Sequence, residues 1–256
     1  MKKYSILMYN FNNYEIMREP EEIDPECEYI YVTDNPDFAK QTKVWNIIID
    51  KDLEGLSPFD KCYRVRFNLF KYVTTPVCIY VDGSIQIHKS LRKLYDDFMA
   101  SGADLGLNIH PERNTVVSEY PFWLNYRKYP KIQYEKHLAM FKAAEYDLTY
   151  KGLYQGTMRI CKNTPLNKQI DDFVFETLVK LGTDGVIERL DQTIYSFILN
   201  KFFTDEVKIF PFSQQVFQSA YMTWKIHRTN YTIAWNKGND NDSYVFNKFV
   251  KLYRLV

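Results

Sequence analysis

An apolar run from Pro76 to Val81 gives way to an acidic turn, Asp82-Gly83-Ser84, and then to an alternating segment that ends at Ile87. A short apolar run bounded by turn residues is typical of a buried central strand. Open α/β sheets bind ligands at the carboxyl ends of such strands. Asp82 and Ser84 there offer oxygen atoms to a hard cation, although an ordinary hairpin turn is the alternative.

Short apolar runs and amphipathic stretches alternate along the rest of the chain. We expect strands at 4–8, 28–32, 44–49, 103–109, 152–162 and 207–210, and helices at 57–72, 90–99, 132–146, 167–181 and 189–202. This alternation predicts an α/β domain around a largely parallel central sheet that is flanked by helices. Residues 213–256 carry few such signals, and we expect a C-terminal tail that packs on the same domain as a lid.

The composition and charge of the chain argue against several classes of protein. The 256 residues carry a net charge of +1, which gives no sign of a nucleic-acid partner. The four cysteines are far apart, as expected of reduced thiols rather than a disulfide framework. No apolar stretch is long enough for a membrane span or a signal peptide, so we expect a cytoplasmic protein. Dinucleotide-binding and P-loop glycine motifs are also absent from the sequence.

Several further motifs occur in a defined order. They are Arg64 and Arg66 before the central strand, Asp82-Gly83-Ser84, His110-Pro111-Glu112-Arg113 with Glu119, the glycine-punctuated segment 152–159, and Arg189-Leu190-Asp191-Gln192. This series resembles the glycosyltransferase-like domain family of plant pectin- and mucilage-related proteins and bacterial surface-polysaccharide loci. The resemblance spans about residues 1–212. It implies a single GT-A (Rossmann-like) α/β domain there, with a mixed, mostly parallel central sheet flanked by helices. It also implies a nucleotide-sugar donor and sugar transfer to an acceptor.

A looser similarity is to the lipooligosaccharide galactosyltransferases of GT-A fold. The matching positions are Arg66, Asp191-Gln192, and His227 with Trp235 and Lys237. Those enzymes have two aspartates in the acidic turn, whereas Ser84 stands at the second position here. Metal-independent action therefore remains an alternative.

The resemblance implies a donor site built around Asp82. With Ser84 and His227, Asp82 would hold Mn²⁺ or Mg²⁺ between the donor phosphates. A guanidinium from the preceding helix would reach the diphosphate or base. The expected donor and nucleotide residues are Tyr9, Asn10, Thr33, Asp34, Arg64, Arg66, Asp82, Gly83, Ser84 and Lys237. Turn formation is the alternative role for the strand-end residues among them.

A second set of residues is expected to meet the sugar or the acceptor. Asp191 and Gln192 are the candidate catalytic residues, although Asp191 could instead cap its helix. The expected sugar and acceptor residues are His110, Arg113, Glu119 and Gln155, for which a local structural network is the alternative.

The prediction is therefore a glycosyltransferase for a hexose or related sugar, using a UDP- or GDP-sugar. Its acceptor would be a glycan or a lipid-linked sugar in surface polysaccharide or capsule synthesis, with at most peripheral membrane contact. A nucleotidyltransferase is the first alternative. A Gly-rich loop with Lys or Arg directly after the first strand would favour it, but residues 9–13 contain neither Gly nor Lys. A non-catalytic carbohydrate-binding domain with a degenerate site is the other alternative, which Ser84 keeps open.

Overall fold

The computed structural model describes residues 1–110, 112–121, 124, 131–182, 187–188, 190–212, 222–225 and 232–233. Its strands are β1 (Tyr4–Asn10), β2 (Cys27–Thr33), β3 (Asn46–Ile48), β4 (Val77–Val81), β5 (Ile85–Ile87), β6 (Leu105–Ile109), β7 (Tyr154–Lys162), β8 (Ile209–Phe212), β9 (Met222–Lys225) and β10 (Thr232–Ile233). Its α-helices are α1 (Pro58–Arg66), α2 (Arg92–Ser101), α4 (Lys131–Ala143), α5 (Pro165–Leu181) and α6 (Asp191–Phe202). Short 3-10 helices are η1 (Pro36–Lys40), η2 (Lys51–Leu53), η3 (Leu69–Lys71) and η4 (Val116–Glu119).

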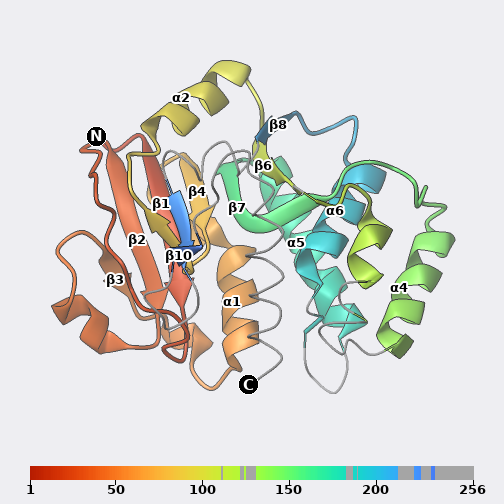
Figure 1. Cartoon of the computed structure of the whole chain (residues 1–256), viewed down its shortest axis with the longest axis horizontal. Coiled ribbons are helices and arrows are strands. Elements are labelled where there is room, and N and C mark those ends of the chain that lie inside the picture. The colour runs from red at the N-terminus through yellow and green to blue at the C-terminus, as the bar shows by residue number, and fades with distance from the viewer. Residues whose placement is uncertain are drawn as a thin grey trace.

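A seven-stranded sheet in the order β3-β2-β1-β4-β7-β6-β8 forms the centre of the molecule (Figure 1). Strand β7 runs antiparallel to β4 and β6, while the other neighbouring pairs are parallel. The α/β class expected from the sequence, with a mixed, mostly parallel sheet flanked by helices, is therefore confirmed. Among the described strands, β3 and β8 lie at the two edges of this sheet.

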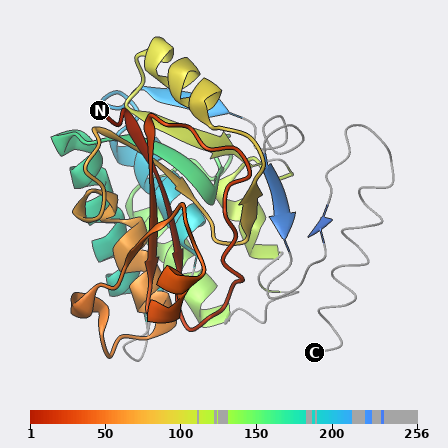
Figure 2. The ribbon, with the colours of Figure 1, turned by 90° about the vertical axis from the view of Figure 1, so that its left-hand side faces the viewer.

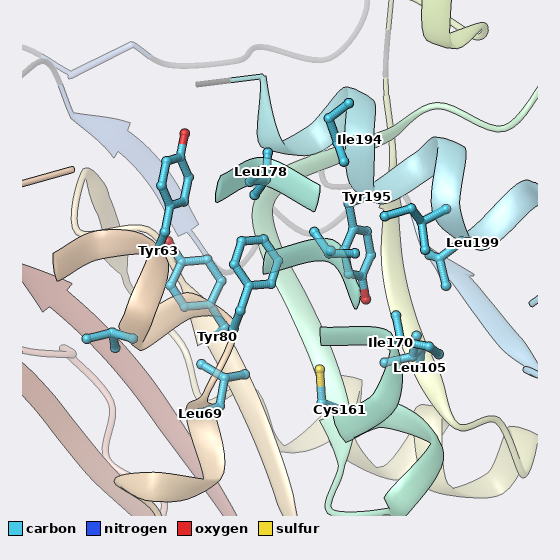
Figure 3. Packing of buried hydrophobic residues seen from close by; sticks show 14 of the residues in the cluster. Tyr63, Leu69, Tyr80, Leu105, Cys161, Ile170, Leu178, Ile194, Tyr195 and Leu199 are labelled. Carbon is cyan, nitrogen blue, oxygen red and sulfur yellow. The ribbon is translucent and has the colours of Figure 1, made fainter. Parts of the chain in front are cut away.

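Alternating side chains divide the core between the two faces of the sheet. In β4, Cys78 and Tyr80 join the cluster beneath α1, α5 and α6, whereas Ile79 and Val81 join the cluster beneath α2. Figure 2 shows α1 and α5 on one side of the sheet and β9 beyond the other. Figure 3 shows the first cluster, where Tyr80 lies close to Leu69 and Tyr63. This period of two is what a strand buried on both faces produces.

The expected helix at 57–72 is shorter in the structure. Ser57 caps its beginning and Pro58 occupies the first turn, as predicted, but α1 ends at Arg66 and a separate 3-10 turn follows. As expected, β4 ends before the acidic turn and a second strand, β5, follows it, but β5 leaves the large sheet. Strand β5 pairs with β9, and β9 pairs on its other side with β10. A short part of the predicted tail thus joins the body, and the rest of the lid expectation lies outside the described residues.

Within the described ranges, no helix combines the length and the apolar character needed to cross a bilayer.

Candidate active site

Arg66 lies at the centre of the candidate site. Its guanidinium Nη2 donates to the Tyr80 hydroxyl and to Asp82 Oδ1, both at 2.8 Å, and Nη1 donates to Asp191 Oδ2. The Tyr80 hydroxyl also donates to Asp82 Oδ1. The end of α1, the end of β4 and the start of α6 therefore meet at one cation, and three of the predicted site residues lie together.

The charges of this group are not balanced. Arg66, Asp82 and Asp191 carry formal charges that sum to −1, and their side chains are only 14–25% exposed. Burial raises the pKa of Asp82, an effect that Arg66 opposes. Burial by itself disfavours the charged guanidinium, but Tyr80, Tyr9 and the two carboxylates raise the pKa of Arg66 well above its ordinary value. A diphosphate approaching this group needs an added cation or a displaced Arg66, because like charges repel.

Gly156 lies beside Arg66 and Asp191. A β-carbon at this position would lie 3.3 Å from Arg66 Nη1 and 3.5 Å from Asp191 Oδ2, so any side chain would crowd the ion pair. The backbone N–H of Gly156 faces Gln192 Oε1 at 3.4 Å. The pairing of β6 with β7 shifts register beside this glycine, and such irregularities often re-aim residues next to a site.

A pocket of about 300 Å³ opens next to Asp82. Most of its wall is apolar, with several aromatic side chains, and the acidic turn is among its polar groups. The lining residues are Tyr9, Asn10, Phe11, Asn12, Tyr14, Glu15, Pro58, Phe59, Cys62, Asp82, Gly83 and Ser84. It lies at the carboxyl ends of β1 and β4, where α/β sheets bind ligands.

Gly83 is required where β1 and the acidic turn approach each other. A β-carbon there would lie 2.9 Å from the Tyr9 carbonyl oxygen, closer than the two atoms can pack. Asn10 holds the loop that follows β1, because its amide donates to the Glu15 carbonyl at 2.7 Å and accepts from the Glu15 N–H at 3.0 Å. The loop between them turns through Asn12 and Asn13, both with left-handed backbone.

Among the other predicted nucleotide residues, Asp34 supports the loop of this pocket, whereas Arg64 lies elsewhere. Thr33 is buried and accepts from the Asn35 N–H, and Asp34 pairs with Lys61 at 2.8 Å. Asp34 also accepts from the Asn12 N–H, so it supports the pocket loop. Arg64 lies over Phe175 and lines a different pocket, with Lys71 and Lys168. The structure therefore brings Arg66, and not Arg64, to the acidic turn.

Three of the four predicted sugar and acceptor residues, His110, Arg113 and Glu119, lie together. Arg113 pairs with Glu119 at 2.9 Å and lies 2.6 Å from the His110 ring, and Glu119 is fully buried. Burial and the charge of Arg113 lower the pKa of His110 to about 4, so its imidazole is neutral at pH 7. Gln155 accepts from Asn108 at 2.8 Å on the neighbouring strands. His110, Arg113 and Glu119 thus contact one another, whereas Gln155 contacts Asn108.

The solved structures with similar chains include glycosyltransferases. Mouse xyloside xylosyltransferase 1, in its apo form, is 11% identical with a TM-score of 0.46, over 83% of this chain and 86% of that one. The galactosyltransferase LgtC with donor and acceptor sugar analogs is 11% identical with a TM-score of 0.49, over 96% and 95%. GlyE of Streptococcus pneumoniae TIGR4 is 12% identical with a TM-score of 0.42, over 84% and 46%.

No protein-family profile matches the chain, and no curated protein sequence does. Identities of 11–12% and TM-scores below 0.5 carry no argument about activity. What the site can do chemically therefore has to follow from its own residues.

A divalent cation is compatible with the described donors at the acidic turn. Asp82 Oδ2 accepts no hydrogen bond from any residue in the described ranges, and the buried Ser84 lines the same pocket. Those ranges contain no group of three or more His, Cys, Asp or Glu side chains suited to a metal. His227 and Lys237 lie outside them. Mg²⁺ often takes few protein ligands and keeps waters or phosphates, so this donor set fits such an ion.

The sequence interpretation missed Tyr80 and Arg159. Tyr80 stands two residues before Asp82, and that spacing places both on the same face of an extended strand. Its hydroxyl could have been expected beside the carboxylate. Arg159 is the last residue of the glycine-punctuated segment 152–159, and nothing local in the sequence indicates that it contacts the Arg66 carbonyl.

Proposed function

We propose that this chain is a glycosyltransferase that moves a sugar from a nucleoside-diphosphate sugar to a glycan or lipid-linked acceptor. The observation that carries the proposal is Arg66 held between Asp82 and Asp191, at the edge of the pocket that β1 and β4 form. An aromatic wall suits a nucleobase, and the acidic turn beside it suits a cation with two phosphates. The sugar would then lie toward Asp191 and Gln192.

In this proposal Asp82 and Ser84 hold Mn²⁺ or Mg²⁺, with His227 as the expected third ligand. When bound, the cation offsets the negative charge that develops on the leaving nucleoside diphosphate. Arg66 contributes a fixed positive charge on the same side and orients both carboxylates. The apolar side chains of the pocket exclude water from the phosphates, which strengthens these interactions.

Asp191 and Gln192 have different proposed roles. If the reaction inverts the anomeric centre, Asp191 takes the proton of the acceptor hydroxyl as general base. If it retains the configuration, the leaving phosphate can take that proton, and the Gln192 amide oxygen stabilises positive charge on the sugar ring. The anomeric configuration of the product, read by NMR, distinguishes the two.

Donor binding gives the direct test. A ligand at 100 times its Kd stabilises the native state by about 2.7 kcal/mol. At about 2–4 °C per kcal/mol, that raises Tm by roughly 5–10 °C in a chain of this size. We expect such a shift with a UDP- or GDP-sugar plus Mn²⁺, and no shift for Asp82→Ala. Asp37→Ala, at an exposed surface pair with Lys40, is the matched control.

The outcomes separate the alternatives. Normal metal-dependent binding and transfer by Asp82→Ala would show that the acidic turn is not the donor site. Release of pyrophosphate from a nucleoside triphosphate and a sugar phosphate would indicate a nucleotidyltransferase. Binding of free sugars, without a response to any nucleotide sugar, would indicate a carbohydrate-binding domain. Ser84→Asp is expected to tighten metal binding, because it restores a second carboxylate.

A further inference from the structure

Arg159 of β7 is a buried cation with an unusual set of partners. Its side chain is only 7% exposed, and its guanidinium pairs with both oxygens of Asp171 on α5, at 2.5 and 2.9 Å. Bidentate pairs of this kind fix orientation as well as contributing energy. Asp171 therefore sets the plane and direction of the guanidinium.

The same guanidinium reaches the end of α1. Nη2 of Arg159 donates to the backbone carbonyl oxygen of Arg66. The last carbonyls of a helix have no partner within the helix, so they accept from other groups or from water. Arg159 thus binds the main chain of the residue whose side chain joins Asp82 and Asp191.

Two aromatic rings complete the surroundings of Arg159. Its guanidinium carbon lies 5.4 Å from the ring centre of Phe67 and 5.5 Å from that of Tyr195. Phe67 follows Arg66 directly, and Tyr195 lies one turn after Asp191 on α6. Figure 3 shows Tyr195 extending from α6 toward Ile170 of α5. One side chain therefore contacts the segments that carry Arg66 and Asp191.

We propose that Arg159, oriented by Asp171, is a positioning residue that sets the placement of Arg66 relative to Asp191. The inference rests on the proposed function only for its catalytic consequence. Arg159 does not line the pocket beside Asp82, so it acts through Arg66 and α6 rather than on a ligand.

The cost of the pair argues for a role beyond stability. Buried ion pairs can often be replaced by apolar side chains without loss of stability, because removing the charges avoids their desolvation. Arg159 Nε is buried and makes no hydrogen bond within the described residues, which adds to that cost. A fork of donors that reaches a carboxylate and a carbonyl together is a property of guanidinium, and an ammonium cannot reproduce it.

The deciding variant combines Arg159→Met with Asp171→Leu. It removes both charges and keeps the core apolar, so the chain should fold with a Tm within a few degrees of the wild type. We expect kcat to fall on the order of 10²-fold, the effect of about 1 Å of misplacement at a reacting group. The donor KM should change much less. Lys168→Met with Asp172→Leu, at an exposed pair that flanks Asp171 on α5, is the matched control.

Arg159→Lys is the second variant, should the double variant not fold. It retains a cation opposite Asp171 but cannot bind both groups, so kcat should again fall at least tenfold. A folded variant of either kind with wild-type kcat would overturn the inference. If no nucleotide sugar serves the wild-type protein, the proposed function fails instead. The ¹⁵Nε signal of Arg66 would then still decide the matter: an unchanged signal in both variants refutes positioning, and a shifted or broadened one supports it.

Discussion

The interaction between Asp191 and Arg66 allows one substitution to be predicted in detail. Asp191→Asn keeps the shape of the side chain and removes its charge. The structure directs this carboxylate to Arg66, and the cap position of α6 is Leu190, which makes no side-chain capping bond. The contacts of the Asp191 carboxylate therefore favour its role in the ion pair with Arg66 over the alternative role as a helix cap.

The loss of stability can be bounded from the burial of the pair. Breaking a fully buried pair costs about 3–5 kcal/mol, and an exposed pair contributes about 0–1 kcal/mol. The two side chains here are 14% and 16% exposed, and Arg66 keeps Asp82 and Tyr80 as partners. We expect a loss of about 2 kcal/mol, or roughly 4–8 °C in Tm.

The expected loss of activity is larger than the loss of stability can explain. A general base contributes about 10²–10⁴-fold in rate. Turnover would be measured well below the Tm of the variant, with Gln192→Ala beside it to test the retaining alternative. Asp37→Asn, whose side chain is 65% exposed, should change neither quantity. Turnover of Asp191→Asn near that of the wild type would refute the base assignment, whatever its Tm.

Three further predictions concern the surroundings of the site. Gly83→Ala should lower the free energy of unfolding by about 1–3 kcal/mol and weaken donor binding, because its β-carbon would lie 2.9 Å from the Tyr9 carbonyl oxygen. An unchanged stability and donor affinity in calorimetry would contradict this prediction. The pKa of His110 falls from 6.5 to about 4 on folding. When the pH is lowered, the unfolded chain therefore binds a proton at His110 before the folded chain does. The free energy of unfolding should therefore lose nothing from His110 above pH 6.5 and should fall by up to about 3 kcal/mol between pH 6.5 and 4. His110→Gln should flatten that slope in melts recorded over this pH range. Truncation before Gln214 removes the strand that pairs with β5, so Tm should fall together with activity; an unchanged Tm would show that this pairing contributes little.

Local patterns were enough to predict the central strand and its acidic turn. In β1, β2 and β4 an apolar run indicates a buried strand, and the turn residues that follow indicate where that strand ends. Arg64 and Arg66 were harder to rank by sequence, yet helix geometry separates them. At 3.6 residues per turn, positions two apart point to nearly opposite sides, so only one of them could face the acidic turn.

The remaining features depend on contacts between distant segments. The shift of register beside Gly156 arises only when β6 and β7 pair, and the hydrophobic pattern gives no sign of it. The bond between Arg159 and Asp171 joins a strand to the following helix, and its further contact with Arg66 spans 93 positions. Strand β9 was missed because its pairing with β5 determines it more than its own short sequence does.

The edges of the large sheet have a consequence for the protein in concentrated solution. An unpaired strand edge can recruit another chain and begin aggregation. Among the strands that the structure describes, one edge strand, β3, has 3 residues, and the other, β8, has 4 residues with Pro211 among them. Proline lacks the N–H that a further strand would need. Both edges are thus poor templates for growth, and Pro211→Val should make the protein more prone to aggregate during refolding without changing its turnover.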